Sequence, residues 1–142
     1  MTTSSGLRHK QAPIIDDGEV IFSVDEKLQN LIQFFWDNDI FTFNSCQDNV
    51  RKTCWIEYEL SDWIEITEMA FRIESRDLYQ FIEEECQVLL LSTDDGQPDE
   101  NDEYWLEGEN LIWTASVRFR KELLPKFEAL VRSAFAEFNS EE

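Results

Sequence analysis

The sequence predicts an α+β protein in which helices pack on one face of an antiparallel sheet of four or five strands. Residues 53–60, TCWIEYEL, alternate apolar with mostly acidic or aromatic side chains, which is the periodicity of a strand with one buried face. Other segments repeat apolar residues at helical spacing, and the connections between neighbouring strands read as hairpins, which implies antiparallel pairing. The predicted order of elements is α-β-β-α-β-β-α.

The N-terminal part is expected to hold a tail, a helix and a strand. Residues 1–20 carry Ser, Thr, Gly and Pro without periodicity, and they predict a flexible tail. Ser23 and Glu26 have the spacing of a capping box, and the apolar stripe behind them predicts a helix over residues 24–37. Residues 38–44, NDIFTFN, then predict a short strand.

The middle of the chain predicts a loop, a helical region and a second apolar strand. Residues 45–52, SCQDNVRK, connect two strands and are long enough to form a hairpin loop with a shape of its own. Residues 61–86 predict two consecutive helices, or one helix kinked near Ser75. Residues 87–92, QVLLLS, are a continuous apolar run, which is typical of a central strand buried on both faces.

The last part of the chain combines an acidic loop, a strand and a helix. Residues 94–109 hold eight acids and no base, and they predict a loop or wide turn. Residues 111–119 predict a strand, and an apolar stripe over residues 123–138 predicts the final helix, with Pro125 in its first turn. One domain is therefore expected over residues 21–139. The exposed face of its sheet is expected to carry Glu57, Glu59, Thr114, Ser116 and Arg118.

The charge of the chain is strongly one-sided. There are 31 Asp plus Glu against 12 Lys plus Arg, which gives a formal net charge of -19. Such a surface repels nucleic acid and anionic membranes and attracts basic proteins. We therefore expect a basic protein partner, with no direct contact to nucleic acid or membrane. Solubility, or adaptation to a salty or crowded cytoplasm, is the alternative explanation of this charge.

The sequence offers little for catalysis. His9 is the only histidine and falls in the predicted tail, so the folded part is expected to lack a Ser-His-Asp or Cys-His arrangement and an ordinary zinc site. The sequence contains no glycine-rich phosphate-binding motif, and its acidic loop lacks the spacing of an EF-hand. No metal and no cofactor is therefore expected.

Cys46 is the one weak catalytic candidate. The bases Arg51 and Lys52 lie nearby in the sequence and would favour a thiolate, and Cys54 would form a redox pair with Cys46 if the hairpin were tight. The alternative is a small apolar residue that caps the core at the end of a strand. The loop is also a candidate structural corner or recognition segment, with candidate residues Ser45, Cys46, Gln47, Asp48 and Arg51.

Aromatic and acidic residues define a candidate surface for binding a protein. Strand alternation places Trp55 on the face opposite Cys54 and Ile56. Aromatic anchors surrounded by complementary charge suit the binding of a basic partner. The candidate binding residues are Trp55, Glu57, Glu59, Asp94, Asp95, Asp99, Glu100, Asp102, Glu103, Tyr104 and Trp105.

Two stretches of the chain resemble a group of known proteins. Residues 39–49, DIFTFNSCQDN, resemble the pattern G-I-x-T-x-x-S-C-x-[GD] of small, mostly uncharacterised bacterial and phage α+β proteins. Residues 115–130, ASVRFRKELLPKFEAL, are similar to the strand and helix that close those proteins. The resemblance implies the same fold outline and no activity. The Ser-Cys run also resembles tRNA wybutosine-synthesis proteins, but Gln47 and Asp48 stand where that family has glycine and arginine.

These observations favour a small acidic cytoplasmic domain that binds a basic protein surface, in the sharpest version as a nucleic-acid mimic that inhibits its partner. Two alternatives stay open: a redox or enzymatic protein that depends on Cys46, and a homo-oligomeric structural protein such as a homodimer. The three cysteines lack C-x-x-C spacing, which indicates free thiols in a reducing compartment. No signal-peptide segment is visible, and no apolar run reaches the roughly 18 residues that span a membrane.

Overall fold

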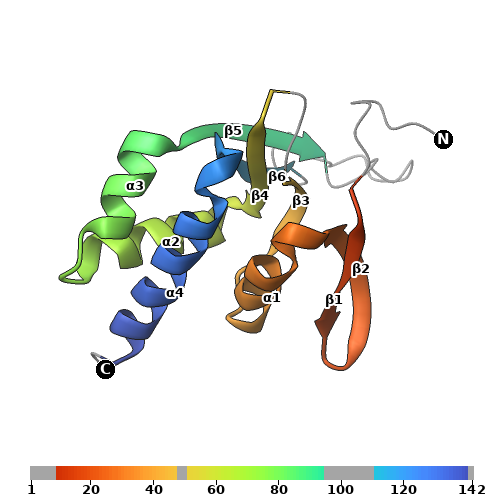
Figure 1. Ribbon diagram of the computed structural model, residues 1–142, viewed down its shortest axis with the longest axis horizontal. Helices are drawn as coiled ribbons and strands as arrows, with labels where there is room; N and C mark the ends of the chain where they lie inside the picture. Colours follow the sequence, from red (N-terminus) through yellow and green to blue (C-terminus); the bar gives the residue numbers. More distant parts are fainter. Residues whose placement is uncertain (1–8, 48–50, 95–110, 141–142) are drawn as a thin grey trace, which may run out of the picture.

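The protein folds as an α+β domain, which confirms the predicted class. The computed structural model describes residues 9–47, 51–94 and 111–140, and Figure 1 shows how the elements are arranged. The strands are β1 (Gln11–Asp16), β2 (Glu19–Asp25), β3 (Thr42–Cys46), β4 (Thr53–Glu59), β5 (Gln87–Asp94) and β6 (Leu111–Arg120). The helices are α1 (Gln29–Asp37), α2 (Leu60–Arg72), α3 (Asp77–Glu85) and α4 (Leu124–Ser140), with short 3-10 turns at Glu26–Leu28 and Lys121–Leu123.

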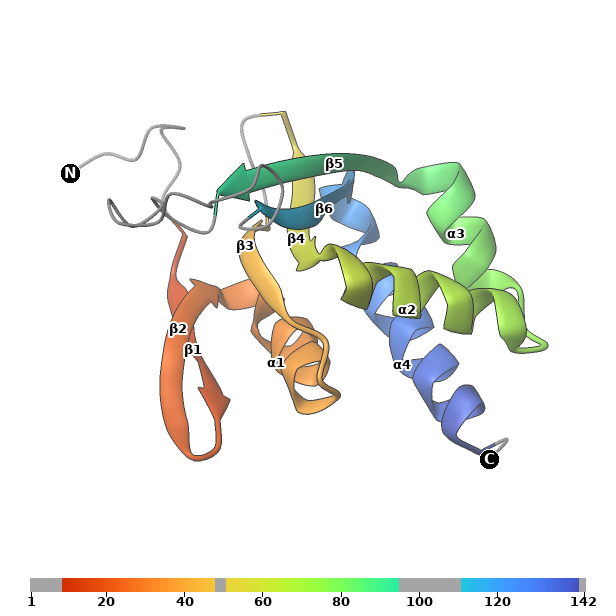
Figure 2. The same ribbon diagram turned by 180° about the vertical axis from the view of Figure 1, so that it is seen from behind.

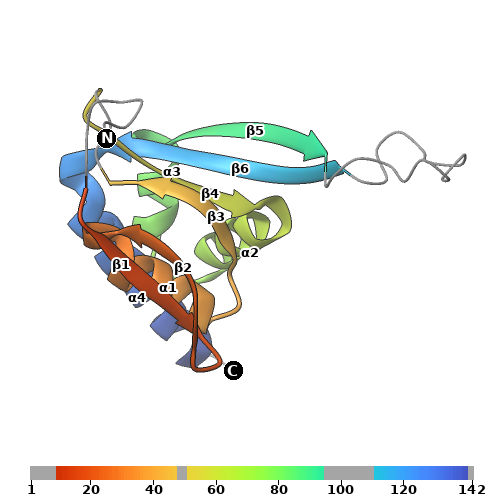
Figure 3. The same ribbon diagram turned by 90° about the vertical axis from the view of Figure 1, so that its right-hand side faces the viewer.

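The main sheet is antiparallel and has the strand order β3-β4-β6-β5. The helices lie on one side of this sheet, as Figure 3 shows, and this arrangement also agrees with the prediction. The segment predicted as one kinked or two separate helices forms two, α2 and α3, which are separated by residues 73–76.

The core lies between the sheet and the helices. The alternation predicted for β4 is confirmed, because Cys54, Ile56 and Tyr58 are all fully buried. Their partners on β6 bury the same face of the sheet. The helices close the core with an apolar stripe that includes Leu31, Phe35, Trp63, Ile66, Leu78, Phe81, Phe127 and Val131.

The prediction of a flexible tail over residues 1–20 is wrong for residues 11–20, which belong to a β-hairpin. Residues 11–25 form a β1–β2 hairpin, which turns at Asp17 (φ 56°) and Gly18 (φ 81°). Positive φ at both central residues is what a tight hairpin turn of the mirror-image type requires, and Asp-Gly suits it. The hairpin packs beside α1 (Figure 3), with Ile14 fully buried. The side chain of Gln33 donates to the Ile15 carbonyl at 2.7 Å and accepts from the Ile15 N–H at 2.8 Å.

The hairpin also removes the predicted capping box. Ser23 lies inside β2, so its hydroxyl is not at the start of a helix. The helical region begins two residues later than predicted, with the 3-10 turn at Glu26, whose backbone N–H donates to the Lys10 carbonyl at 2.7 Å. The pairing of the two strands therefore competes successfully with the local capping signal.

Two predictions about the outer parts of the sheet are also wrong. β5 is an edge strand and not a central one, since it pairs only with β6 among the described strands. Thr114 and Ser116, predicted on the exposed face, are buried, because they are small side chains on an inner strand between β4 and β5. Glu57, Glu59 and Arg118, which share that face, are partly exposed.

A helix C-cap fixes the direction of the chain from α1 to β3. The Ile40 N–H donates to the Phe35 carbonyl at 2.8 Å, and the Asp39 N–H donates to the Trp36 carbonyl at 3.1 Å. This pair of bonds is a Schellman motif, in which the residue after the cap has a left-handed conformation. Asp39 occupies that position with φ 62°, a conformation that glycine adopts without strain.

Replacing Asp39 with glycine should stabilise the protein. Glycine removes the left-handed strain of an aspartate, and we expect the free energy of unfolding to rise by about 0.5 kcal/mol. Chemical denaturation measures this difference. Asp39→Asn is the matched control, because asparagine tolerates the same conformation without the charge. An equal gain from Asp39→Asn and Asp39→Gly would assign the effect to charge and contradict the backbone explanation.

Replacing Tyr58 with phenylalanine should also stabilise the protein. The Tyr58 hydroxyl is buried and has no hydrogen-bond partner among the described residues. Burial raises the pKa of this hydroxyl well above its usual value, so it stays neutral. We expect Tyr58→Phe to raise the free energy of unfolding by about 1 kcal/mol, since the desolvation cost of the hydroxyl disappears. A loss of stability in the same denaturation measurement would show that the hydroxyl has a partner.

Candidate functional site

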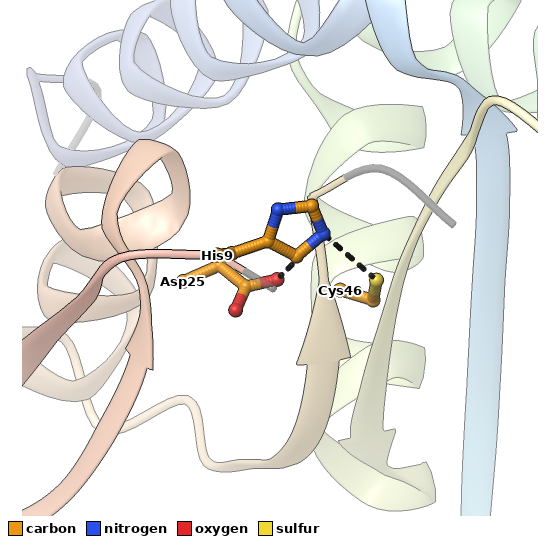
Figure 4. Close-up of side chains that lie close together, drawn as sticks. All are labelled: His9, Asp25 and Cys46. Atoms are coloured by element: carbon orange, nitrogen blue, oxygen red, sulfur yellow. Dashed lines mark hydrogen bonds and ion pairs between the residues drawn. The ribbon is translucent and has the colours of Figure 1, made fainter. Parts of the chain in front are cut away.

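Three side chains that carry chemistry meet at the open end of the β1–β2 hairpin. His9 precedes β1, Asp25 ends β2, and Cys46 ends β3, and Figure 4 shows them side by side. Pairing of Gln11 with Asp25 brings the start of β1 next to the end of β2. The prediction that the folded part lacks a Cys-His arrangement is therefore wrong, because His9 belongs to the folded part and approaches Cys46.

The three side chains converge on one nitrogen of the imidazole ring. His9 Nε2 lies 4.0 Å from Cys46 Sγ and 4.0 Å from Asp25 Oδ2. The three possible ligand atoms all lie within 4.8 Å of one another. The side chains of His9 and Asp25 are only 15% and 11% exposed, so the group is largely withdrawn from water.

Backbone and amide groups hold Asp25 and His9 in place. Asp25 accepts hydrogen bonds from Gln11 Nε2 at 2.6 Å and from the Gln47 backbone N–H at 3.0 Å. The side-chain oxygen of Gln47 accepts from the Lys27 N–H at 2.8 Å, which directs its amide nitrogen at His9 Nδ1, 3.3 Å away. Gln47, which the sequence placed only in a candidate loop, is thus the residue that orients the imidazole.

This hydrogen bonding assigns a tautomer to neutral His9. Because Nδ1 accepts from Gln47, the ring proton lies on Nε2 and points toward the carboxylate and the sulfur. A general base for a thiol needs an unprotonated nitrogen at the sulfur, so the arrangement as it stands is not an activated thiol–imidazole pair. It is a compact set of nitrogen, oxygen and sulfur atoms.

The position of Cys46 contradicts two interpretations of this residue, as a cap of the core and as a redox partner of Cys54. Cys46 pairs with Trp55, and Ser45 pairs with Ile56, so Cys46 lies on the face of the sheet opposite the buried core. Cys54 is buried in the core on the other face. Cys46 is therefore not a cap of the core, and it does not form a redox pair with Cys54.

The remaining candidate loop residues are not part of the cluster. Ser45 is partly buried, and Arg51 is exposed at the start of the segment that leads into β4. Asp48 lies outside the described residues.

The structure describes only some of the candidate protein-binding residues. Trp55, Glu57 and Glu59 are partly exposed on β4, and the Glu59 carboxylate accepts from the Ser61 hydroxyl at 2.6 Å. Asp94 is the last residue of β5. The other predicted members lie outside the described residues: Asp95, Asp99, Glu100, Asp102, Glu103, Tyr104 and Trp105.

Strand β5 is an exposed apolar edge, which the sequence reasoning missed. Figure 2 shows it continuing directly from α3 along the border of the sheet. Four consecutive residues are exposed: Val88 (38%), Leu89 (44%), Leu90 (58%) and Leu91 (38%). Val88 and Leu90 share the helix-side face with Val117 and Ala115, and Leu89 and Leu91 share the outer face. β5 is therefore apolar on both faces, and it also lies at a free edge of the described sheet.

A sequence signal for the hairpin and its histidine was present. Asp17-Gly18 is a strong turn dipeptide, and alternating apolar residues flank it at Ala12, Ile14, Phe22 and Val24. The position of β5 had no such signal, because an apolar run reads the same at the edge and at the centre of a sheet.

Comparisons with protein-family models, with curated proteins and with solved structures yielded no match to this chain. In the part of the chain that the structure describes, no helix has both the length and the apolar character needed to cross a membrane.

The three cysteines should differ sharply in reactivity. Burial, together with the smaller effect of the neighbouring Glu85, raises the pKa of the Cys86 thiol to about 12. Cys54 is fully buried. At about pH 8 we therefore expect a thiol reagent to label Cys46 first, and the other two only after unfolding. Mass spectrometry of labelled peptides checks this order. Labelling of Cys86 at the rate of Cys46 in the folded protein would contradict it.

Proposed function

We propose that this protein is an acidic interaction domain of the cytoplasm that binds a basic protein through strand β5. The observation that carries this proposal is the run of exposed apolar residues, Val88 to Leu91, on an edge strand. An exposed apolar edge is a site of pairing with another chain unless the protein protects it.

The edge supplies two kinds of interaction at once. Within the described residues, no strand pairs with the outer edge of β5, and its outward N–H and C=O groups there can pair with an added strand. A peptide that pairs there gains main-chain hydrogen bonds, while Leu89 and Leu90 offer apolar contacts on opposite faces. Strand addition therefore uses the whole length of β5.

The surrounding charge selects a basic partner. Glu83, Glu84 and Glu85 precede β5, Asp94 ends it, and the whole chain has a formal net charge of -19. The nearby cation Arg120 already faces Glu85 at 3.6 Å and Glu122 at 3.5 Å. A partner strand with alternating apolar and basic residues would complement both the apolar side chains of β5 and the negative charge around it. Inhibition by mimicry of a nucleic acid is the sharper form of this proposal.

Self-association through β5 is the second candidate function. Two antiparallel copies of an eight-residue edge strand can pair about a two-fold axis and join their sheets. The same acidic charge on both copies opposes this assembly. Sedimentation at low and high salt separates the two functions, because salt would strengthen a homodimer and weaken a complex with a basic partner.

A substitution in β5 should weaken binding without unfolding the protein. We expect Leu90→Ser to weaken the complex with a basic partner about tenfold, because it removes the most exposed apolar contact of the strand. The measurement is retention of proteins from a host extract on the immobilised domain, over a salt series. Val20→Ser, at an equally exposed apolar residue of the β1–β2 hairpin, is the matched control.

The salt series decides between specific and incidental capture. A basic protein that is lost with Leu90→Ser and at high salt, and kept with Val20→Ser, supports the proposal. Retention that both variants share, or that salt leaves unchanged, contradicts it.

A further inference from the structure

We propose that His9, Asp25 and Cys46 form a zinc site with three protein ligands. The cluster lies at the end of β3, and β3 and β5 are the opposite edges of the main sheet, so this inference is independent of the function proposed for β5.

The spacing of the three ligand atoms supports an ion between them. His9 Nε2 lies 4.0 Å from both Asp25 Oδ2 and Cys46 Sγ, which is longer than an ordinary hydrogen bond to oxygen. Zinc binds nitrogen at about 2.0 Å and sulfur at about 2.3 Å, which places these two atoms about 3.5 Å apart in a tetrahedral site. Closing the site around one ion therefore requires His9 and Cys46 to approach by about 0.5 Å, His9 and Asp25 by about 0.7 Å, and Asp25 and Cys46 by up to about 1.3 Å.

The ligand types select zinc over the hard cations. Calcium and magnesium are held by oxygen ligands, whereas imidazole and thiolate favour zinc and similar transition metals. The site supplies one nitrogen, one oxygen and one sulfur. Three protein ligands leave the fourth tetrahedral position for water or a further ligand.

The hydrogen bonds around Asp25 resemble the outer shell of a metal site, and Gln47 lies where its side chain can complete that shell at His9 once its amide rotates. Gln11 and the Gln47 backbone orient the Asp25 carboxylate, and the Gln47 side chain faces the second nitrogen of His9. Such partners fix the orientation of metal ligands and tune their affinity.

Zinc binding requires a defined rearrangement of protons. The Cys46 thiol releases its proton to solvent, and the ring proton of His9 moves from Nε2 to Nδ1 so that Nε2 can bind the metal. The Gln47 amide must then rotate to place its oxygen at Nδ1, and its contact with the Lys27 N–H is lost. Glutamate at position 47 would accept from both groups without rotation, so Gln47→Glu should tighten binding about tenfold.

The first experiment uses the complete protein and Co²⁺ as a spectroscopic probe, with excess Mg²⁺ to occupy the many surface carboxylates. We expect one equivalent of Co²⁺ to give a thiolate-to-cobalt charge-transfer absorption, and Zn²⁺ to displace it and to protect Cys46 from a thiol reagent. Absence of the charge-transfer absorption in the native protein would overturn the proposal, as would a thiol that reacts equally fast with and without Zn²⁺.

Variants then assign the ligands. We expect His9→Ala and Cys46→Ser each to weaken Zn²⁺ binding at least a hundredfold by competition with a chelating dye, and Cys86→Ser to leave it unchanged. Lys10→Gln, which makes the same change in charge beside His9, is the control for Gln47→Glu. Equal tightening by these two substitutions, or unchanged affinity after loss of Cys46, would overturn the assigned site.

Discussion

Burial of one face of β4 is the constraint on which the rest of the fold depends. Tyr58 is fully buried, and its ring packs edge-to-face on Phe35 of α1 at 5.2 Å and against Trp63 of α2 at 5.1 Å. The same strand pairs with β3 on one side and β6 on the other. One alternating segment therefore positions two helices and two strands. A shift of its pairing register by one residue would turn the whole apolar face of β4 toward the solvent side of the sheet.

The β1–β2 hairpin links the fold to its chemistry. It is held to α1 by the buried Ile14 and by the two hydrogen bonds between Gln33 and Ile15. That attachment places His9 at the end of β3, where Cys46 turns away from the core. The chemistry of the cluster thus depends on a segment whose composition resembles a tail, and a protein without the docked hairpin would lose His9 and Asp25 together.

The two candidate sites lie on opposite edges of the main sheet and use different physics. The β3 edge gathers polar atoms that are mostly withdrawn from water, where hydrogen bonds to Gln47 and Gln11 set the geometry. The β5 edge exposes apolar side chains on an acidic protein, which suits a partner with basic and apolar character. A partner bound at β5 need not contact the cluster, so one protein can carry both properties.

The sequence alone determined the α+β class, the alternating strand β4, the pair of helices after it, β6 and the final helix. Local periodicity predicts these elements, and it depends only on residues that are close together along the chain. Only the tertiary structure decided that β5 is an edge, that Ser116 is buried, and that His9 meets Cys46. Packing across the whole domain determines the strand order and brings together residues that are far apart in the sequence. A local pattern of residues does not predict either feature.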